Sequence, residues 1–99
     1  MNKAMNEAMN EADNAHLAGA RQEIDKIDMS IWLLLEKRFA LSKEVAEIKN
    51  NFQLPVLDEK REKDVLTKID NLSCDAEVSS AINKIYKLIF ELSRKYQSE

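Results

Sequence analysis

Residues 17–52 read LAGARQEIDKIDMSIWLLLEKRFALSKEVAEIKNNF, and this stretch decides the fold. Residues on one side of it recur every three or four positions, which is the spacing of one face of an α-helix. One member of this face is the charged Arg38, and the others are Leu17, Ala20, Ile24, Ile27, Ile31, Leu34, Leu41, Val45, Ile48 and Phe52. The pattern predicts a single helix from about Leu17 to Asn50, roughly 50 Å long.

A helix of this length exceeds the diameter of a compact domain built from so short a chain. The remaining residues are too few to cover its whole apolar face, because they provide only two shorter helices. A second copy of the chain can cover it, with the two long helices packed against each other. The sequence therefore predicts a homodimeric helical bundle.

Two shorter helices complete the predicted all-α fold of three helices per chain. The Asn50–Asn51 pair suits the C-terminal cap of the long helix, and Pro55 begins a short extended connector. Asp58 is predicted to cap a second helix that ends near Asn71, and Ser73 or Asp75 is predicted to cap a third. The apolar stripes of these two helices are Val65, Leu66 and Ile69, and then Val78, Ile82, Ile85, Tyr86, Ile89, Leu92 and Tyr96.

The composition excludes several classes of protein. One Gly and one Pro among 99 residues leave too few turn formers for a sheet protein or a Gly-rich phosphate loop. Cys74 is the single cysteine and His16 the single histidine, so the sequence predicts no disulfide within the chain and no metal site, and it indicates a cytoplasmic protein. A net charge of −3 and the lack of a long apolar run favour neither nucleic acid nor a membrane as partner.

The N-terminus has a different character from the rest of the chain. Residues 1–12 repeat the four-residue pattern Met-Asn-Lys/Glu-Ala three times, and this unit is too short for a repeat domain. We therefore predict that residues 1–16 are an N-terminal extension, either a frayed helix or an appended leader, and that residues 17–99 form the helical domain.

Arg38 interrupts the apolar face, and a buried guanidinium needs a partner. The partner is either an internal Asp or Glu, or an anionic ligand. Lys49 lies 11 residues further on, within ~20° of the same face and some 16 Å along the axis, so two cations flank one stretch of the helix. Arg21 is about 25 Å away from Arg38, too far to share one small ligand on the same helix. If two copies cross antiparallel near Trp32, Arg21 of one chain lies beside the Arg38–Lys49 stretch of the other.

Further polar residues fall on the inner faces of the two shorter helices. Glu62 continues the apolar stripe of its helix inward, and Asp58 lies four residues before it. Ser93 and Gln97 are likewise four residues apart on the third helix. Together with the cations these groups suit a site that binds a small polyanion and stabilises charge without covalent chemistry.

The order of these residues resembles that of the all-helical, or type II, chorismate mutases. The runs that carry the resemblance are Arg21-Gln-Glu-Ile-Asp-Lys-Ile-Asp28, Glu36-Lys-Arg38, Val45-Ala-Glu-Ile-Lys49 and Pro55-Val-Leu-Asp-Glu-Lys-Arg-Glu62. The resemblance extends from about Leu17 to the C-terminus. The resemblance implies an isomerase that rearranges chorismate to prephenate, on the route to phenylalanine and tyrosine, in an intertwined dimer and without a cofactor.

The resemblance also implies which residues contact the substrate. They are Arg21, Arg38, Lys49, Asp58, Arg61, Glu62, Ser93 and Gln97. Arg38 would hold one carboxylate of chorismate, and Arg21 of the partner subunit the other. Ser93 and Arg61 would be supporting contacts.

The catalytic residues implied are Lys49, Gln97, Arg38 and Glu62. Lys49 and Gln97 would donate hydrogen bonds to the ether oxygen as its bond to carbon breaks. Glu62 would accept a hydrogen bond from the ring hydroxyl of chorismate, which would also contact the backbone near Asp58.

Three other functions are compatible with the same residues. An isochorismate-pyruvate lyase has a similar fold and also binds an enolpyruvyl dianion. A non-catalytic dimerisation or regulatory domain would pair Arg38 and Lys49 with Glu62 and its neighbours. The chain could also be one domain of a longer bifunctional enzyme.

Overall fold

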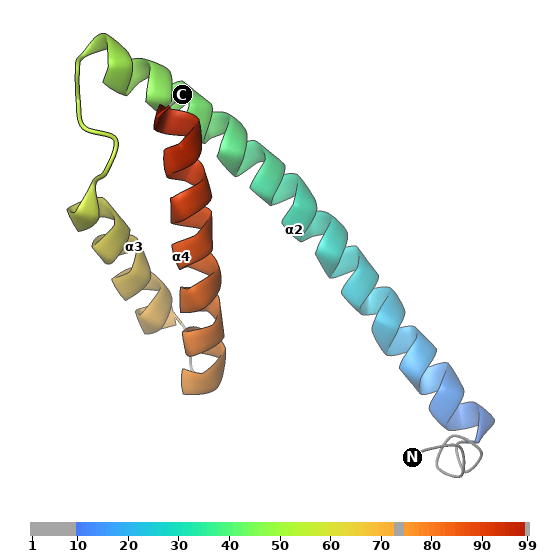
Figure 1. The fold of residues 1–99 in the computed structure, drawn as a ribbon. Coiled ribbons are helices and arrows are strands. Elements are labelled where there is room, and N and C mark those ends of the chain that lie inside the picture. Colours follow the sequence, from blue (N-terminus) through green and yellow to red (C-terminus); the bar gives the residue numbers. More distant parts are fainter. Residues whose placement is uncertain (1–9, 73–74, 99) are drawn as a thin grey trace. The chain divides into compact units, whose positions relative to one another are not determined.

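The computed structural model describes residues 10–72 and 75–98, with side chains as far as Tyr96. These residues form three helices, α2 (Glu11–Asn51), α3 (Glu59–Leu72) and α4 (Ala76–Ser98), and no strand (Figure 1). The predicted all-α fold with one very long first helix is confirmed. Ser73, one of the two predicted caps, and Cys74 lie outside the described residues.

Helix α2 begins six residues before the predicted start. The Oδ1 atom of Asn10 accepts a hydrogen bond of 2.8 Å from the backbone N–H of Asp13, so Asn10 is the N-cap. Glu11 and Asp13 then place negative charge in the first turn, where the helix dipole favours it. The last residues of the predicted extension, Glu11 to His16, are therefore helical.

The chain divides into two compact units, residues 1–36 and 37–99. The described part of the first unit belongs almost wholly to α2, and most of its large apolar side chains are exposed, as 53% for Ile24 and 57% for Trp32 illustrate. The second unit contains the rest of α2 together with α3 and α4, and it holds the candidate site.

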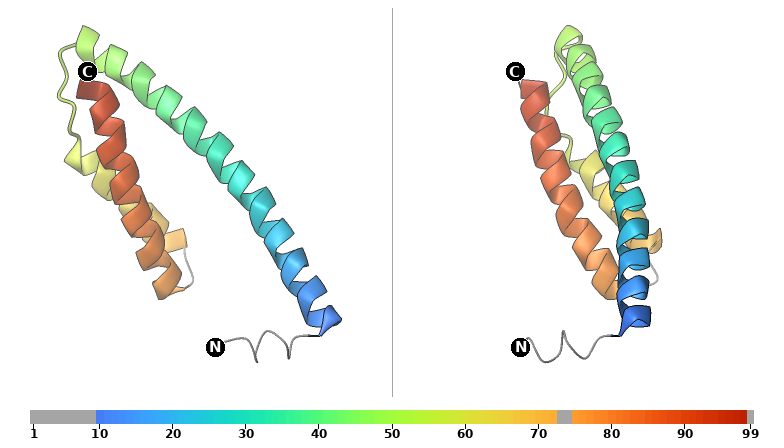
Figure 2. Two further views of the ribbon diagram at one scale, coloured as in Figure 1. Left: turned by 45° about the vertical axis from the view of Figure 1, so that its right-hand side comes forward. Right: turned by 90° about the vertical axis from the view of Figure 1, so that its right-hand side faces the viewer.

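Within the second unit, α3 and α4 pack side by side in opposite directions, as both views in Figure 2 show. The C-terminal turns of α4 contact α2, where the rings of Phe39 and Tyr96 lie 5.6 Å apart. The buried residues in the described part of the chain are few, and two of them are polar. They are Ser42, Ile89, Phe90 and Ser93.

Helix α2 ends in a Schellman motif centred on Gln53. The backbone N–H of Leu54 donates to the carbonyl of Lys49 at 2.8 Å, and that of Gln53 donates to the carbonyl of Asn50 at 3.3 Å. Gln53 has a φ of 55°, in the left-handed region. The predicted role of the Asn pair is wrong in detail, because Asn50 and Asn51 remain helical and Gln53 takes the left-handed position.

Each of the two shorter helices begins at an aspartate, as predicted. The Oδ1 atom of Asp58 accepts a hydrogen bond of 3.0 Å from the backbone N–H of Arg61. Asp75 does the same for Glu77, at 2.8 Å. Each carboxylate satisfies a backbone donor that the helix itself leaves unpaired. The first of these caps also fixes where α3 enters the candidate site.

Candidate active site

A cavity of about 380 Å³ lies between the three helices of the second unit. This volume is within the range that small-molecule sites occupy. Charged and apolar side chains share its wall, which is made of Arg38, Leu41, Ser42, Val45, Lys49, Val56, Asp58, Arg61, Glu62, Val65, Phe90, Ser93 and Arg94.

The guanidinium of Arg38 reaches from α2 to α4. Its Nη1 donates a hydrogen bond of 3.1 Å to Ser93 Oγ, and its central carbon lies 5.8 Å from the ring centre of Tyr86 and 5.7 Å from that of Phe90. These are cation–π distances. Among the described residues no carboxylate forms an ion pair with Arg38. The first of the two partners expected for Arg38, an internal Asp or Glu, is therefore not what the structure shows.

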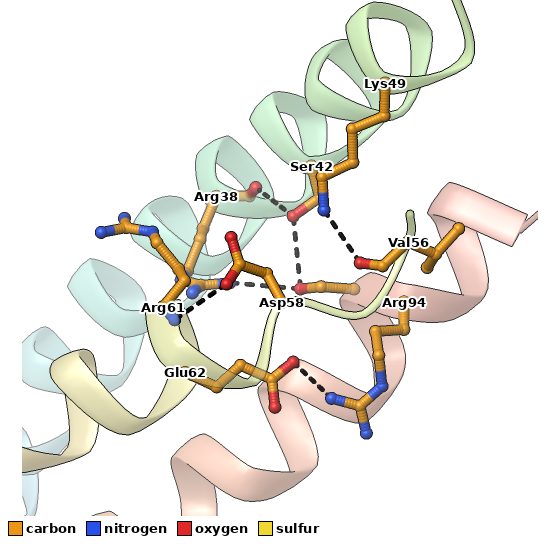
Figure 3. Close-up of polar contacts among 9 residues, drawn as sticks. Arg38, Ser42, Lys49, Val56, Asp58, Arg61, Glu62 and Arg94 are labelled. Atoms are coloured by element: carbon orange, nitrogen blue, oxygen red, sulfur yellow. Dashed lines mark hydrogen bonds and ion pairs between the residues drawn. The ribbon is translucent and has the colours of Figure 1, made fainter. Parts of the chain in front are cut away.

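Ser42 links the same two helices from one turn further along α2. Its hydroxyl lies 3.1 Å from the backbone carbonyl of Arg38 (Figure 3). It also lies 3.2 Å from Ser93 Oγ, and both serines are buried. Because a hydroxyl can donate and accept at once, the two serines and the guanidinium form a continuous hydrogen-bond network. This network fixes the position of Arg38 at the cavity wall.

Lys49 is held by the connector that follows α2. Its Nζ donates a hydrogen bond of 2.8 Å to the backbone carbonyl of Val56. The sharp end of α2 at Gln53 turns the connector back toward the helix, which brings Val56 within reach. The connector thus orients the ammonium group at the cavity, as Figure 3 shows.

The N-cap and the first turn of α3 supply three charged residues to the wall, Asp58, Arg61 and Glu62. Asp58 caps the helix, and its backbone carbonyl accepts a hydrogen bond of 3.1 Å from the N–H of Glu62. Residues three and four positions apart share a helix face, so this short segment presents both signs of charge to one cavity.

Glu62 is paired with an arginine of α4. The Oε2 atom of Glu62 and Nη1 of Arg94 are 2.5 Å apart, and the two side chains are 24% and 33% exposed (Figure 3). The pair joins α3 to α4 at the cavity wall.

The formal charges that line the cavity sum to a positive value. Four side chains are cationic, namely Arg38, Lys49, Arg61 and Arg94, and two are anionic, namely Asp58 and Glu62. The difference is two positive charges. A cavity of this kind favours a small dianion, although the whole chain carries a charge of −3.

Six of the eight residues predicted for the site line this cavity. The two others are Arg21 and Gln97. Arg21 belongs to the first unit and does not line the cavity, and Gln97 lies on α4 with its side chain outside the described part. The described residues contain no group of acidic, histidine or cysteine side chains that could hold a metal ion. Nor do they form a helix both long and apolar enough to cross a membrane.

Ser42 and Arg94 are two polar wall residues that the sequence analysis did not single out. Ser42 could have been found, because it lies four residues after Arg38 and therefore on the same helix face. Arg94 could not have been found in this way. The sequence around it does not distinguish it from an ordinary exposed arginine near a C-terminus.

The fold and the cavity define an all-helical protein with a net cationic cavity, whose size and charge suit a small anion. Residues 20–98 match the family described as chorismate mutase type II, which is most of the chain. The chain belongs to the type II chorismate mutase family.

Individual relatives agree with this assignment. A chorismate mutase from Methanocaldococcus jannaschii is 37% identical over 84 residues, which cover 84% of this chain and 85% of that protein. A bifunctional chorismate mutase/prephenate dehydratase from Aquifex aeolicus is 42% identical over 53 residues, which are 54% of this chain and 15% of that protein.

Solved structures with the same fold include a form II chorismate mutase from Thermus thermophilus. Its TM-score is 0.79 at 26% identity, over 85% of this chain and 96% of that one. A conserved hypothetical protein from Pyrococcus furiosus has a TM-score of 0.69 at 34% identity, over 83% of this chain and 95% of that one.

Proposed function

We propose that this chain rearranges chorismate to prephenate, a step toward phenylalanine and tyrosine, and that the cavity described above is its active site. The observation that carries the proposal is the clustering of six expected substrate contacts around one cavity with two net positive charges. Chorismate is a dianion, so its charge matches that of the cavity. The membership of the type II family supports the same reaction.

The reaction requires no covalent bond between the protein and the substrate. A Claisen rearrangement is unimolecular, so the enzyme holds the flexible substrate in its reactive conformer and stabilises the charge that develops on the ether oxygen. In the proposed complex, Arg38 binds a carboxylate while Lys49 and Gln97 donate to the ether oxygen. The position of Lys49 at the cavity and its hydrogen bond to Val56 support a preoriented donor.

The remaining contacts fix the ring. Glu62 accepts a hydrogen bond from the ring hydroxyl of chorismate, which also contacts the backbone near Asp58. Ser93 and Arg61 make supporting contacts with the bound substrate. The hydrogen bond from Arg38 to Ser93 supports this part of the proposal, because it links a carboxylate-binding group to a second polar group at the cavity wall.

The second carboxylate requires a second copy of the chain. We propose an intertwined homodimer in which Arg21 of the partner subunit completes each site. Apolar side chains along the first part of α2 support it, since Ile27 is 56% exposed and Leu34 is 64% exposed in the single chain. Contiguous apolar surface of this kind marks an interaction face. We also propose a cytoplasmic location, which the single cysteine among 99 residues supports.

The proposal is tested by adding the purified protein to chorismate and following the loss of its absorbance. Identification of prephenate as the product supports the proposed reaction. A parallel incubation with isochorismate, in which salicylate and pyruvate are sought, tests the lyase reaction. If chorismate is unchanged, or if only isochorismate is consumed, the proposed function is wrong.

A further inference from the structure

Arg94 and Glu62 form an ion pair across two helices at the wall of the cavity. The family resemblance gives Glu62 a role at the ring hydroxyl, but it gives none to Arg94. We propose that Arg94 is a positioning residue, which holds Glu62 in place for the ring hydroxyl and offsets the charge of that carboxylate toward a dianionic substrate. This inference rests on the proposed function, since it concerns how chorismate binds.

The geometry leaves Glu62 able to bind a ligand while it is paired. Arg94 Nη1 engages one oxygen, Oε2, whereas a carboxylate offers two oxygens and about four acceptor positions. A ring hydroxyl can therefore donate to the same carboxylate without displacing Arg94. Fixing the side chain beforehand lowers the entropy that is lost when the substrate binds.

The charges around the cavity give a second reason for the pair. Without Arg94 the net charge of the lining side chains would fall from two positive charges to one, and Glu62 would face the incoming dianion without its ion-pair partner. Like charges in a partly enclosed site repel each other more strongly than in water. The carboxylate needed for the hydroxyl is thus compatible with a dianion because Arg94 accompanies it.

A purely structural role for the pair makes a different prediction. As a link between α3 and α4 it would affect the stability of the fold and leave substrate binding alone. A partly exposed ion pair contributes little to stability, so a structural role predicts small effects throughout. Two measurements distinguish these roles. One is the KM for chorismate when Arg94 is replaced, and the other is the KM when Glu62 is neutralised as well.

The experiment compares four variants with the wild-type protein in the chorismate assay. Arg94→Gln removes the cation, and we expect KM to rise about tenfold, because Glu62 is then neither held in place nor offset in charge when the dianion binds. We expect kcat to stay within about threefold, because the ring hydroxyl changes none of its own bonds in the rearrangement and is bound equally in the ground and transition states. Arg94→Lys keeps the charge but not the planar geometry, so its KM should rise by less, about threefold.

Charge balance is restored in the double variant Arg94→Gln with Glu62→Gln. Its amide oxygen still accepts the hydroxyl and no longer repels the dianion, so its KM should lie below that of Arg94→Gln alone. Lys87→Gln is the matched control, because Lys87 is an exposed cation on the same helix that does not line this cavity. Its KM should be unchanged.

The outcomes separate this inference from the proposed function. If the wild-type protein does not convert chorismate, the proposed function fails and the inference fails with it. If the wild-type protein is active and KM is the same in Arg94→Gln as in Lys87→Gln, only the role of Arg94 is wrong. A double variant no better than Arg94→Gln would overturn the charge argument. Should Arg94→Gln fail to fold, the KM of Arg94→Lys relative to Lys87→Gln decides the matter.

Discussion

Lys49 is the side chain whose loss should cost most in the proposed reaction. A single preorganised donor at a developing oxyanion is typically worth roughly 3–4 kcal/mol. We expect Lys49→Ala to lower kcat by about a hundredfold or more, with helix content and melting temperature close to those of the wild type. Steady-state kinetics with chorismate measures the effect. Lys37→Ala, an exposed lysine on the same helix, is the control, and near-normal turnover of Lys49→Ala would contradict the assigned role.

The neutral side chain of Gln97 allows a prediction of how kcat depends on pH. An amide donates its hydrogen bond at every pH, so kcat should vary little through neutrality, whereas a carboxyl group donates only when it is protonated. We expect Gln97→Glu to be active at acidic pH and to lose activity as the pH rises and the carboxyl group ionises. A pH profile of kcat for both proteins is the measurement. A steep fall in wild-type kcat between about pH 5 and 7 would count against Gln97 as the donor.

At the scale of single residues the sequence allowed a partial prediction of the site. The helical spacing of Arg38 and Lys49 placed two cations on one face, and both line the cavity. The partners of Arg38 were not predictable in the same way. The hydroxyl of Ser93 lies 55 positions away, and only tertiary packing brings it to the guanidinium. Arg94 was not identified as a site residue for the same reason, because its ion pair with Glu62 joins two different helices.

At the scale of helices, the end of α2 offers a test of the local conformation. Gln53 has a φ of 55°, which costs an L-residue roughly 1–2 kcal/mol relative to the right-handed region. Glycine adopts this conformation freely but loses more entropy on folding, so the two effects partly cancel. We expect Gln53→Gly to stabilise the fold by about 0.5–1 kcal/mol. Chemical denaturation measures it, with Gln53→Ala as a control that should give no gain.

Helix positions were more predictable than helix ends. The three- and four-residue spacing of apolar residues depends on the geometry of the helix itself, so it located all three helices. Asp58 and Asp75 were identifiable as caps because capping is a local interaction. The start of α2 at Glu11 was missed because the repeat before Leu17 has no apolar stripe, while Asn10 and the acidic first turn still favour a helix there.

At the scale of the whole molecule, the proposed dimer makes a quantitative prediction. A variant lacking Arg21 and a variant lacking Lys49 should each be inactive alone, because every site in either homodimer lacks one of the two residues. Mixing them should restore about a quarter of the wild-type sites, since half of the dimers are mixed and one of their two sites is complete. Chorismate turnover after mixing is the measurement. No recovery, once subunit exchange has been shown, would exclude a crossing Arg21.

The buried residues of the second unit have a consequence for protein engineering. Three of its four buried residues, Ser42, Phe90 and Ser93, also line the cavity. A mutation that makes this small core more apolar would therefore remove polar groups from the candidate site, and thermostability would be gained at the expense of turnover. A search for stabilised variants should accordingly target the helix ends and the exposed faces, where the two properties can be optimised independently.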